Sequence, residues 1–243
     1  EIPDAKSAEL SLLGNRYLLS DGFSIETQAN ERDLQDNLRW IREARRQSDW
    51  LVVSVHCHEF GGASLLTASS RAELEETADF VTKFAHQTID EGADVFVGHG
   101  SHFPMGIEIY QGKPIFYSVG NFVFQNETVG FFPADAYERF DLDLKATPSD
   151  FLDARTAGGK KGHPSDPAYW ENMFAVCKFE AKKLLEIKIF PIDQGFGRPR
   201  PQRGRPVLAD GEVANRVIER VTRLSRRYGT KVVNREGVGV IEV

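Results

Sequence analysis

The sequence of 243 residues predicts an α/β fold, and three observations carry this prediction. The segments 50–55 and 93–97 are apolar runs without strict alternation, which is typical of strands buried on both faces of a parallel sheet. Between them lies a segment with helical spacing of apolar residues, so that the order matches a parallel βαβ unit. Each of the two strands is followed at once by a pair of histidines.

The first predicted helix covers residues 31–47. Leu34, Leu38 and Ile41 recur at helical spacing, and Asn30 is a suitable N-cap. A short strand is expected before it, at residues 16–20.

The second predicted helix lies between the two apolar strands. We expect it to begin after Ser69 or Ser70 and to end at Gly92, where a glycine can terminate the last turn. Its apolar stripe is Leu74, Ala78, Val81, Ala85 and Ile89.

Beyond residue 97 the pattern changes to hairpins and one further helix. The predicted elements are strands at 107–110, 114–119, 173–180 and 184–191, a helix at 211–228 and a strand pair at 231–242.

Two segments show few periodic runs. Residues 126–170 are rich in glycine, proline, aspartate and aromatic residues, and we expect a long loop insertion with one short helix near 134–142. Residues 192–210 hold three prolines and three glycines, which predicts an extended segment. With these segments included, residues 1–243 are expected to form a single domain.

The composition is that of a globular protein, with 41% hydrophobic and 27% charged residues. A net charge of -6 argues against nucleic acid as a partner. No apolar run approaches the ~20 residues of a membrane span. The two cysteines cannot form a disulfide framework, and as unpaired thiols they favour a reducing compartment, so that a cytoplasmic location is expected.

The chemistry of the chain is concentrated in the histidines that follow the two strands: His56, His58, His99 and His102. The carboxyl ends of neighbouring parallel strands are where α/β sheets place their ligand crevice. Histidine is the commonest metal ligand and transfers protons near neutral pH. The sequence therefore predicts half of a metal-dependent active site.

The neighbours of these histidines have different expected roles. Glu59 adds a carboxylate, either as a metal ligand or as an acceptor that fixes a histidine tautomer. Cys57 lies between two histidines on an extended segment and points the other way, so that a small buried residue is expected rather than a nucleophile. His86, on the polar face of a helix, and His163, in a loop, are expected to be incidental.

Two segments carry a family resemblance. Residues 90–102 (DEGADVFVGHGSH) and 106–122 (GIEIYQGKPIFYSVGNF) resemble the CapA-type capsule and poly-γ-glutamate synthesis proteins. That family has a calcineurin-like metallophosphoesterase fold, an αββα sandwich that holds one or two metal ions. The resemblance implies that residues 1–243 are the C-terminal portion of such a domain.

The resemblance also implies site roles. His56 corresponds to the family's metal histidine after a strand, and His99 and His102 correspond to its late Gly-His-x-x-His element. The implied metal ligands are thus His56, His99 and His102, and the implied catalytic residues are His58, His102 and Glu59. Because this chain has His-Cys-His-Glu where relatives have His-Trp-Gly-x-Glu, His58 remains an extra ligand, a residue that orients a ligand, or a proton shuttle.

The early ligand motifs of the superfamily, Asp-x-His, Gly-Asp and Gly-Asn-His, do not occur in the sequence. We therefore expect a missing N-terminal half of the same protein as a partner. One or two divalent ions (Mn, Fe, Zn or Ca) are implied as cofactors, and these residues alone cannot complete a two-metal site.

Three functions follow as hypotheses. The first is a metal-dependent hydrolase that acts on a phosphate ester or a γ-glutamyl polymer, with His102 or His58 as general acid or base. The second is a metal-dependent peptide epimerase that uses the same histidines. The third is a non-catalytic component of polymer assembly. Since relatives of this type include anchored extracellular proteins, that location is the alternative to the cytoplasm.

Overall fold

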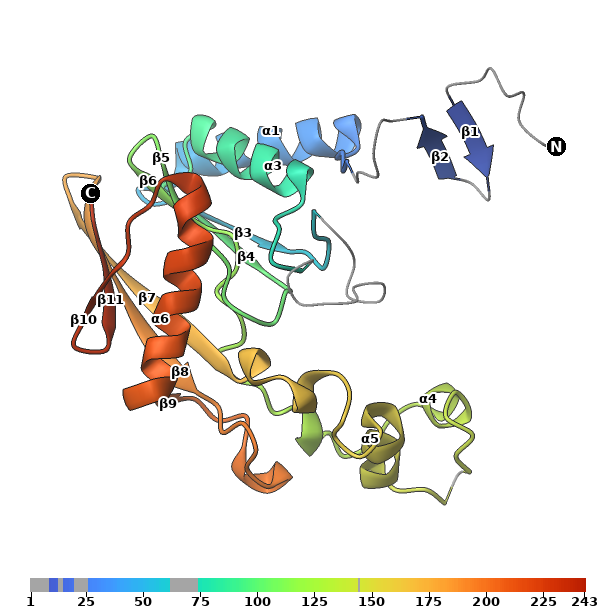
Figure 1. Cartoon of the computed structure of the whole chain (residues 1–243). Coiled ribbons are helices and arrows are strands. Elements are labelled where there is room, and N and C mark those ends of the chain that lie inside the picture. Colours follow the sequence, from blue (N-terminus) through green and yellow to red (C-terminus); the bar gives the residue numbers. More distant parts are fainter. Residues whose placement is uncertain (1–8, 13–14, 20–25, 62–73, 144) are drawn as a thin grey trace.

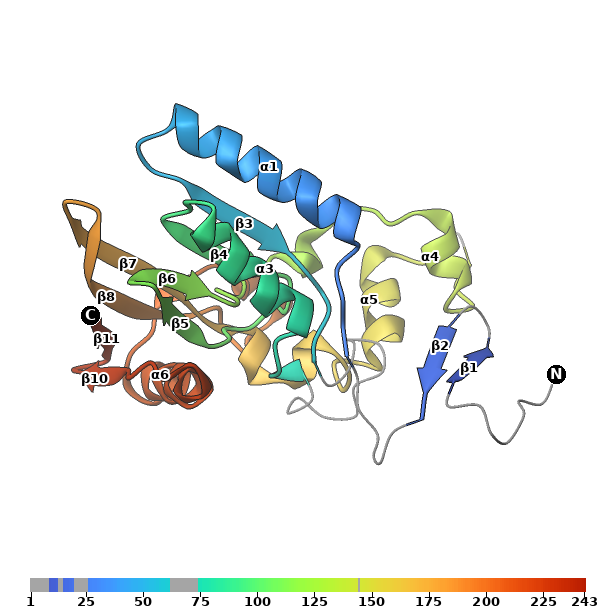
Figure 2. The same ribbon diagram turned by 90° about the horizontal axis from the view of Figure 1, so that it is seen from above.

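Two facing β-sheets form the centre of the molecule, and helices α1 (Glu31–Gln47) and α3 (Asp79–Asp90) cover the outer face of the first sheet (Figure 1 and Figure 2). The predicted α/β fold is confirmed. The computed structural model describes residues 9–12, 15–19, 26–61, 74–143 and 145–243.

The first sheet contains the two strands that carry the histidines. Its strands are β3 (Val52–His56), β4 (Val95–His99), β5 (Ile107–Tyr110) and β6 (Lys113–Phe116), in the order β3-β4-β6-β5. The strands β3, β4 and β6 are parallel, and β5 pairs with β6 as an antiparallel hairpin. In the β3–β4 ladder, His56 lies directly opposite His99, so the predicted βαβ unit aligns the two histidine clusters.

Alternation along β3 decides what each face of the sheet contacts. Val53 and Val55 pack into a core cluster with residues of α3 and with Phe96, which is fully buried. Successive residues of a strand point to opposite faces, so Val52, Ser54 and His56 lie on the other face, and all three are exposed.

The helix α1 has the predicted bounds. The Asn30 side chain accepts a hydrogen bond from the Asp33 backbone N–H at 3.2 Å, which confirms the predicted N-cap. Leu38 and Ile41 are its buried residues.

The helix between the strands differs from the prediction. Its expected start at Ser69 or Ser70 lies outside the described residues, and within them α3 begins at Asp79. Leu74 therefore belongs to the preceding segment, although it is buried in the same core cluster as Val81 and Ala85.

The second sheet is antiparallel. It consists of β7 (Glu171–Glu180), β8 (Lys183–Asp193), β9 (Val207–Leu208), β10 (Val233–Arg235) and β11 (Val238–Glu242), in the order β10-β11-β8-β7 with β9 on β8. Met173 and Ile189 on its inner face pack against Phe116 of the first sheet.

Helix α6 (Gly211–Ser225) packs on that same inner face, beside the edge of the first sheet. The Ser225 hydroxyl accepts a hydrogen bond of 2.9 Å from the Ile107 backbone N–H at the start of β5. The described residues thus form a helix layer and two sheets with α6 alongside β5. A helix layer over the far face of the second sheet, as an αββα sandwich has, is not found in this described part.

The insertion at 126–170 contains two α-helices rather than the single one expected near 134–142. These are α4 (Ala134–Glu138) and α5 (Pro148–Thr156), and they share a small core of their own that includes Tyr137 and Phe151. A capping box between Thr147 and Asp150 starts α5. Three 3₁₀ turns belong to the same segment: η1 (Asn126–Thr128), η2 (His163–Ser165) and η3 (Pro167–Tyr169).

The remaining elements are short. The expected strand at 16–20 is β2 (Asn15–Leu18), which pairs with β1 (Glu9–Leu12), and its residue 20 lies outside the described part. The turn η4 (Arg200–Gln202) lies in the expected extended segment, and η5 (Arg226–Tyr228) follows α6. None of the described helices has the length and apolar character needed to cross a bilayer.

Candidate functional site: a row of histidines at the ends of two strands

The ends of β3 and β4 bring the two histidine clusters into contact. The Nδ1 atoms of His56 and His99 lie 2.8 Å apart, and the Nε2 atoms of His56 and His58 lie 2.9 Å apart. The Ser54 hydroxyl lies 3.0 Å from Nε2 of His99. His56 therefore has a histidine neighbour at each of its ring nitrogens.

The four histidines form a row in the order His99, His56, His58 and His102, so His102 does not contact His56 or His99 directly. Its ring faces His58, with ring centroids 5.4 Å apart, and His163, with centroids 5.0 Å apart. The structure thus brings His56, His58 and His99 together as direct neighbours, and it places His102 beyond His58.

The pKa values of two histidines in the row are lowered. Burial lowers the pKa of His58, and the nearby His102 and His56 add to this effect. Burial also lowers the pKa of His99, with His56 as the second cause. Both rings are therefore neutral near pH 7, which is the form that binds a metal ion or accepts a proton.

The row fits a metal ion as a partial set of ligands. The imidazoles of His56 and His99 direct ring nitrogens at each other, and His58 adds a third nitrogen next to them. Among the described residues, however, no group of three or more histidine, cysteine, aspartate or glutamate side chains has the arrangement that could hold an ion.

The Glu59 carboxylate is not paired with a histidine in the described part of the chain, and the Glu59 side chain is exposed. Cys57 packs partly buried against the core cluster under α3, as the alternation along the strand predicts. Burial raises the pKa of the Cys57 thiol, so that its position does not favour a thiolate nucleophile.

His102 is held by an asparagine. Its Nδ1 lies 3.0 Å from Oδ1 of Asn121, and the Asn121 amide nitrogen donates to the His102 carbonyl at 3.0 Å. Since that second bond makes Oδ1 the acceptor in the first, Nδ1 of His102 is the atom that donates to Asn121. His102 also has a φ of 67°, an uncommon backbone conformation for a residue with a side chain.

Two buried amides in turn hold Asn121. The Asn172 side chain, which is fully buried, accepts the Asn121 backbone N–H at 3.0 Å and donates to the Gln194 side chain at 3.0 Å. The Gln194 amide donates to the carbonyls of Asn121 and Phe122. A Cβ on Gly120, whose φ is 72°, would lie 1.9 Å from the Asn172 oxygen, so glycine is required there.

Gly100 lies where the two histidine clusters approach each other closely. Its φ is 116°, and a Cβ built on it would lie 2.3 Å from the Cys57 carbonyl oxygen and 2.9 Å from Cδ2 of His58. The positive φ and the close approach to residues 57–58 together require a glycine at position 100.

His163 belongs to the site, although the sequence indicated an incidental residue. Its ring contacts His102, Phe124 and Tyr169, with centroids 4.6–5.0 Å away. Burial, together with the nearby His102 and Arg155, lowers its pKa to about 4. Sequence spacing gives no signal for this contact, because His163 lies about sixty positions from His102.

His86 is a structural residue. Its Nε2 lies 3.0 Å from both carboxylate oxygens of Glu108, and its ring stacks on Tyr110 with centroids 4.0 Å apart. Its side chain is 31% exposed, so His86 is half-buried on the polar face where the sequence placed it. The contact ties α3 to β5, away from the other histidines.

Comparison with known proteins confirms the resemblance noted in the sequence. Residues 19–126 match the sequence model of the bacterial capsule synthesis protein family PGA_cap. An uncharacterized protein of Sinorhizobium fredii is 37% identical over 240 residues, which cover 96% of this chain and 50% of that protein.

Two further relatives have descriptive names. A probable polyglutamine synthesis accessory protein of Mycobacterium tuberculosis is 30% identical over 206 residues, 84% of this chain and 41% of that protein. The PGA biosynthesis protein CapA of Bacillus subtilis is 36% identical over 84 residues, 35% of this chain and 19% of that protein. The chain thus spans about half the length, or less, of the curated relatives it matches.

Proposed function

Because this chain belongs, through residues 19–126, to the bacterial capsule synthesis protein family PGA_cap, we propose that it forms part of a metal-dependent hydrolase of the metallophosphoesterase type. The observation that carries the proposal is the pair of Nδ1 atoms of His56 and His99, 2.8 Å apart at the ends of two parallel strands. The lowered pKa of His99 supports it, since a neutral imidazole is the form that binds a metal.

His56 and His99 would hold the ion, with His58 beside them. A bound divalent ion of this kind supplies an activated water at neutral pH and stabilises charge at the attacked centre. The expected candidates are Mn, Fe, Zn and Ca, and metal analysis distinguishes them. Two imidazole nitrogen ligands favour Mn, Fe or Zn over Ca, which prefers oxygen ligands.

His102 and His58 are the proposed proton-transferring residues. The Asn121 side chain fixes the Nδ1 proton of His102, so its Nε2 is the atom that takes or gives a proton. His58 lies between His102 and His56 and can relay a proton between the two parts of the row.

We also propose that a second half of the same polypeptide completes the site. An open groove of about 320 Å³ lies between the two sheets, lined by apolar residues that include Val52, Val97, Phe122 and Phe174. It adjoins β3 and β7, which are end strands of their sheets as far as these are described. Val52 shares its face of β3 with His56, so a segment in this groove would approach the histidines. The greater length of the relatives supports this occupant.

The substrate proposal follows the names of the relatives. A polyglutamine synthesis accessory protein and a PGA biosynthesis protein are among them, and they favour a γ-glutamyl polymer or a phosphate ester of polymer assembly. Fold analogy alone does not identify a substrate, and the aryl phosphate test addresses the ester alternative.

Hydrolysis of an aryl phosphate, with and without added Mn²⁺, tests the proposal in the completed polypeptide. We expect metal-stimulated turnover that His56→Ala and His102→Ala remove with little change in melting temperature, because neither side chain belongs to the hydrophobic core. The matched control is His86→Gln, which should lower the melting temperature and leave metal content and turnover intact. Metal retained by His56→Ala would overturn the ligand assignment.

Epimerisation is the second candidate function. The rings of His58 and His102 face each other with centroids 5.4 Å apart, and two facing bases can remove and return a proton α to a carbonyl. Solvent deuterium incorporated into an unhydrolysed glutamyl peptide would select this reaction. A polypeptide that neither takes up metal nor turns over any of these compounds would instead act as a binding component of polymer assembly.

A further inference from the structure

A cavity opens beside the row of histidines, between it and the insertion at 126–170. Its volume is about 520 Å³, which is within the range of small-molecule sites. His58, His102 and His163 line it on one side, and residues of α5 and the segment after it line the other. A molecule held there would have one end next to the proposed proton-transferring residues.

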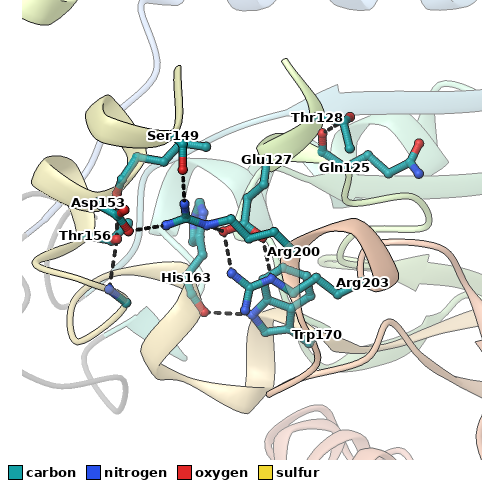
Figure 3. A network of polar contacts seen from close by, with 12 residues as sticks. Gln125, Glu127, Thr128, Ser149, Asp153, Thr156, His163, Trp170, Arg200 and Arg203 are labelled. Carbon is teal, nitrogen blue, oxygen red and sulfur yellow. Dashed lines mark hydrogen bonds and ion pairs between the residues drawn. The ribbon is translucent and has the colours of Figure 1, made fainter. Parts of the chain in front are cut away.

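The wall of this cavity is built by a polar network (Figure 3). Arg200 and Arg203 both pair with Glu127, whose side chain is only 6% exposed. Arg200 reaches across to the Ser149 hydroxyl at 2.9 Å and to Asp153 at 2.6 Å, which fastens α5 to the extended segment. The acidic residue of the cavity lining, Glu127, is therefore already neutralised.

Two cations of the same lining have no such partner. Arg155 and Lys161 are both exposed, and neither side chain forms an ion pair or hydrogen bond with any residue in the described ranges. Arg155 is close enough to His163 to lower the pKa of that ring. With Glu127 neutralised, the lining carries an excess of positive charge in a chain whose net charge is -6.

We infer that this cavity binds an oxyanion of the substrate, a carboxylate or a phosphoryl group, through Arg155 and Lys161. The inference rests on the proposed function and deepens it, because it places the anionic part of the substrate beside His58 and His102. A guanidinium presents a planar fork to a carboxylate or phosphoryl group, and an ammonium adds a second point charge. Two unpaired cations at an open cavity also attract an anionic polymer in solution.

The aromatic part of the lining supports an extended ligand. Phe124 and Trp170 pack edge to face with centroids 5.0 Å apart, and the Trp170 indole N–H donates to the His163 carbonyl at 2.8 Å. This rigid wall lies next to the cations, so a ligand with an apolar stem and anionic ends can contact both. A γ-glutamyl chain has this form, with a short aliphatic stem in each unit.

Calorimetric titration and histidine NMR test the inference on the chain itself. The probes are γ-linked tri-glutamate, its uncharged tri-amide and inorganic phosphate. We expect tri-glutamate or phosphate to bind and to shift the ring signals of His58, His102 and His163. The double variant Arg155→Gln/Lys161→Gln should weaken this binding about tenfold, the sum of two partly exposed ion pairs.

The matched control is Lys160→Gln, an exposed lysine next to the site that does not line the cavity. It should leave binding unchanged. If the double variant binds tri-glutamate more weakly than the wild type does, the ligand of the cavity is a carboxylate. If only phosphate binding is weakened, the ligand is a phosphoryl group. Equal losses in Lys160→Gln and the double variant, or no binding of either anion, would overturn the inference.

This outcome is separable from that of the proposed function. Binding in the titration needs neither turnover nor a metal. If the anions bind in a way that depends on Arg155 and Lys161 but no metal-stimulated hydrolysis occurs, the hydrolase proposal is refuted and the anion site stands. If hydrolysis occurs and does not change when Arg155 and Lys161 are replaced, the anion site is refuted and the hydrolase proposal stands.

Discussion

His102 and Asn121 hydrogen-bond to each other twice, side chain to side chain and side chain to backbone, each at 3.0 Å. The pair fixes both the tautomer of the imidazole and the path of the backbone that carries it. Asn172 and Gln194 both form hydrogen bonds with Asn121. The orientation of His102 therefore depends on the side-chain amides of these three residues.

Replacing Asn121 with alanine should therefore reduce turnover by about 10- to 100-fold, the usual cost of losing a residue that orients a functional histidine. The tautomer of His102, read from its ¹⁵N chemical shifts, should become a mixture. A matched control is Asn215→Ala, which removes an exposed amide on α6. If Asn121→Ala retained the Nδ1–H tautomer and full activity, the orienting role would be wrong.

Asp94 joins three elements through its buried carboxylate. Its side chain is 4% exposed and pairs with Arg45 at 2.7 Å and with Lys113 at 2.8 Å. Asp94→Asn leaves both cations without their partner and should lower the free energy of unfolding by about 2–3 kcal/mol, somewhat less than for a fully buried pair. Urea denaturation measures this, with Asp36→Asn on the exposed face of α1 as the control.

The same aspartate makes stability depend on pH at the acid end. Burial raises the pKa of Asp94, but hydrogen bonds from Lys113, the Leu51 backbone and Arg45 outweigh it, and the net pKa is lowered. A lowered pKa contributes stability above the unfolded-state pKa of about 3.9, and this contribution is lost as the pH falls through the folded-state value. The stability difference between wild type and Asp94→Asn should thus be constant from pH 7 to 5 and shrink below about pH 4. A difference that persists at pH 2 would contradict this origin.

Gly100 and Gly112 form a matched pair for testing the close approach at the site. Both have positive φ, 116° and 73°, but a Cβ on Gly112 would meet nothing within 4 Å. Gly112→Ala should cost about 1–2 kcal/mol of unfolding free energy from backbone strain alone. Gly100→Ala adds a collision with the Cys57 carbonyl and should cost about 3 kcal/mol or more. Equal melting temperatures for the two variants would show that the collision relaxes freely.

The two cysteines should be slow to react in the folded protein. Burial raises the pKa of Cys177 to about 11, and burial also raises that of Cys57. Because only the thiolate is nucleophilic, alkylation by iodoacetamide at pH 8 should be slow in the native state and rapid in urea. Mass spectrometry after timed quenching measures the alkylation rate of each cysteine. Rapid alkylation of Cys57 in the native state would contradict this prediction and support Cys57 as a nucleophile.

The sequence predicted those features that depend on local pattern. The helix α1 has its predicted bounds because an N-cap and an apolar stripe define it within one segment. The histidines at 56 and 99 were expected to meet because parallel strands end at one edge of a sheet, and their ring nitrogens do lie in contact. The direction of Cys57 followed from the alternation of a strand.

Features that depend on distant contacts were not predictable in the same way. His163 reaches the site through a ring contact with His102, about sixty positions away in the sequence. The buried amide residues Asn172 and Gln194 lie in β7 and directly after β8, and the composition of these strands does not indicate a polar network. The sequence spacing of Arg155 and Lys161 is no different from that of other exposed cations nearby. They differ because Glu127, the acidic residue of the same cavity, forms its ion pairs with Arg200 and Arg203 instead.

The register of the β3–β4 ladder has a consequence for how this protein can change in length during evolution. His56 and His99 form the last pair of a ladder of five, which begins at Val52 and Val95. Since neighbouring strand residues face opposite ways, losing any one residue from Val52 to Val55 would put Cys57 in place of His56 and turn His56 to the opposite face of the sheet. Insertions and deletions should therefore accumulate in the turns around the ladder, while the interval from Val52 to His56 keeps a constant length in any functional descendant.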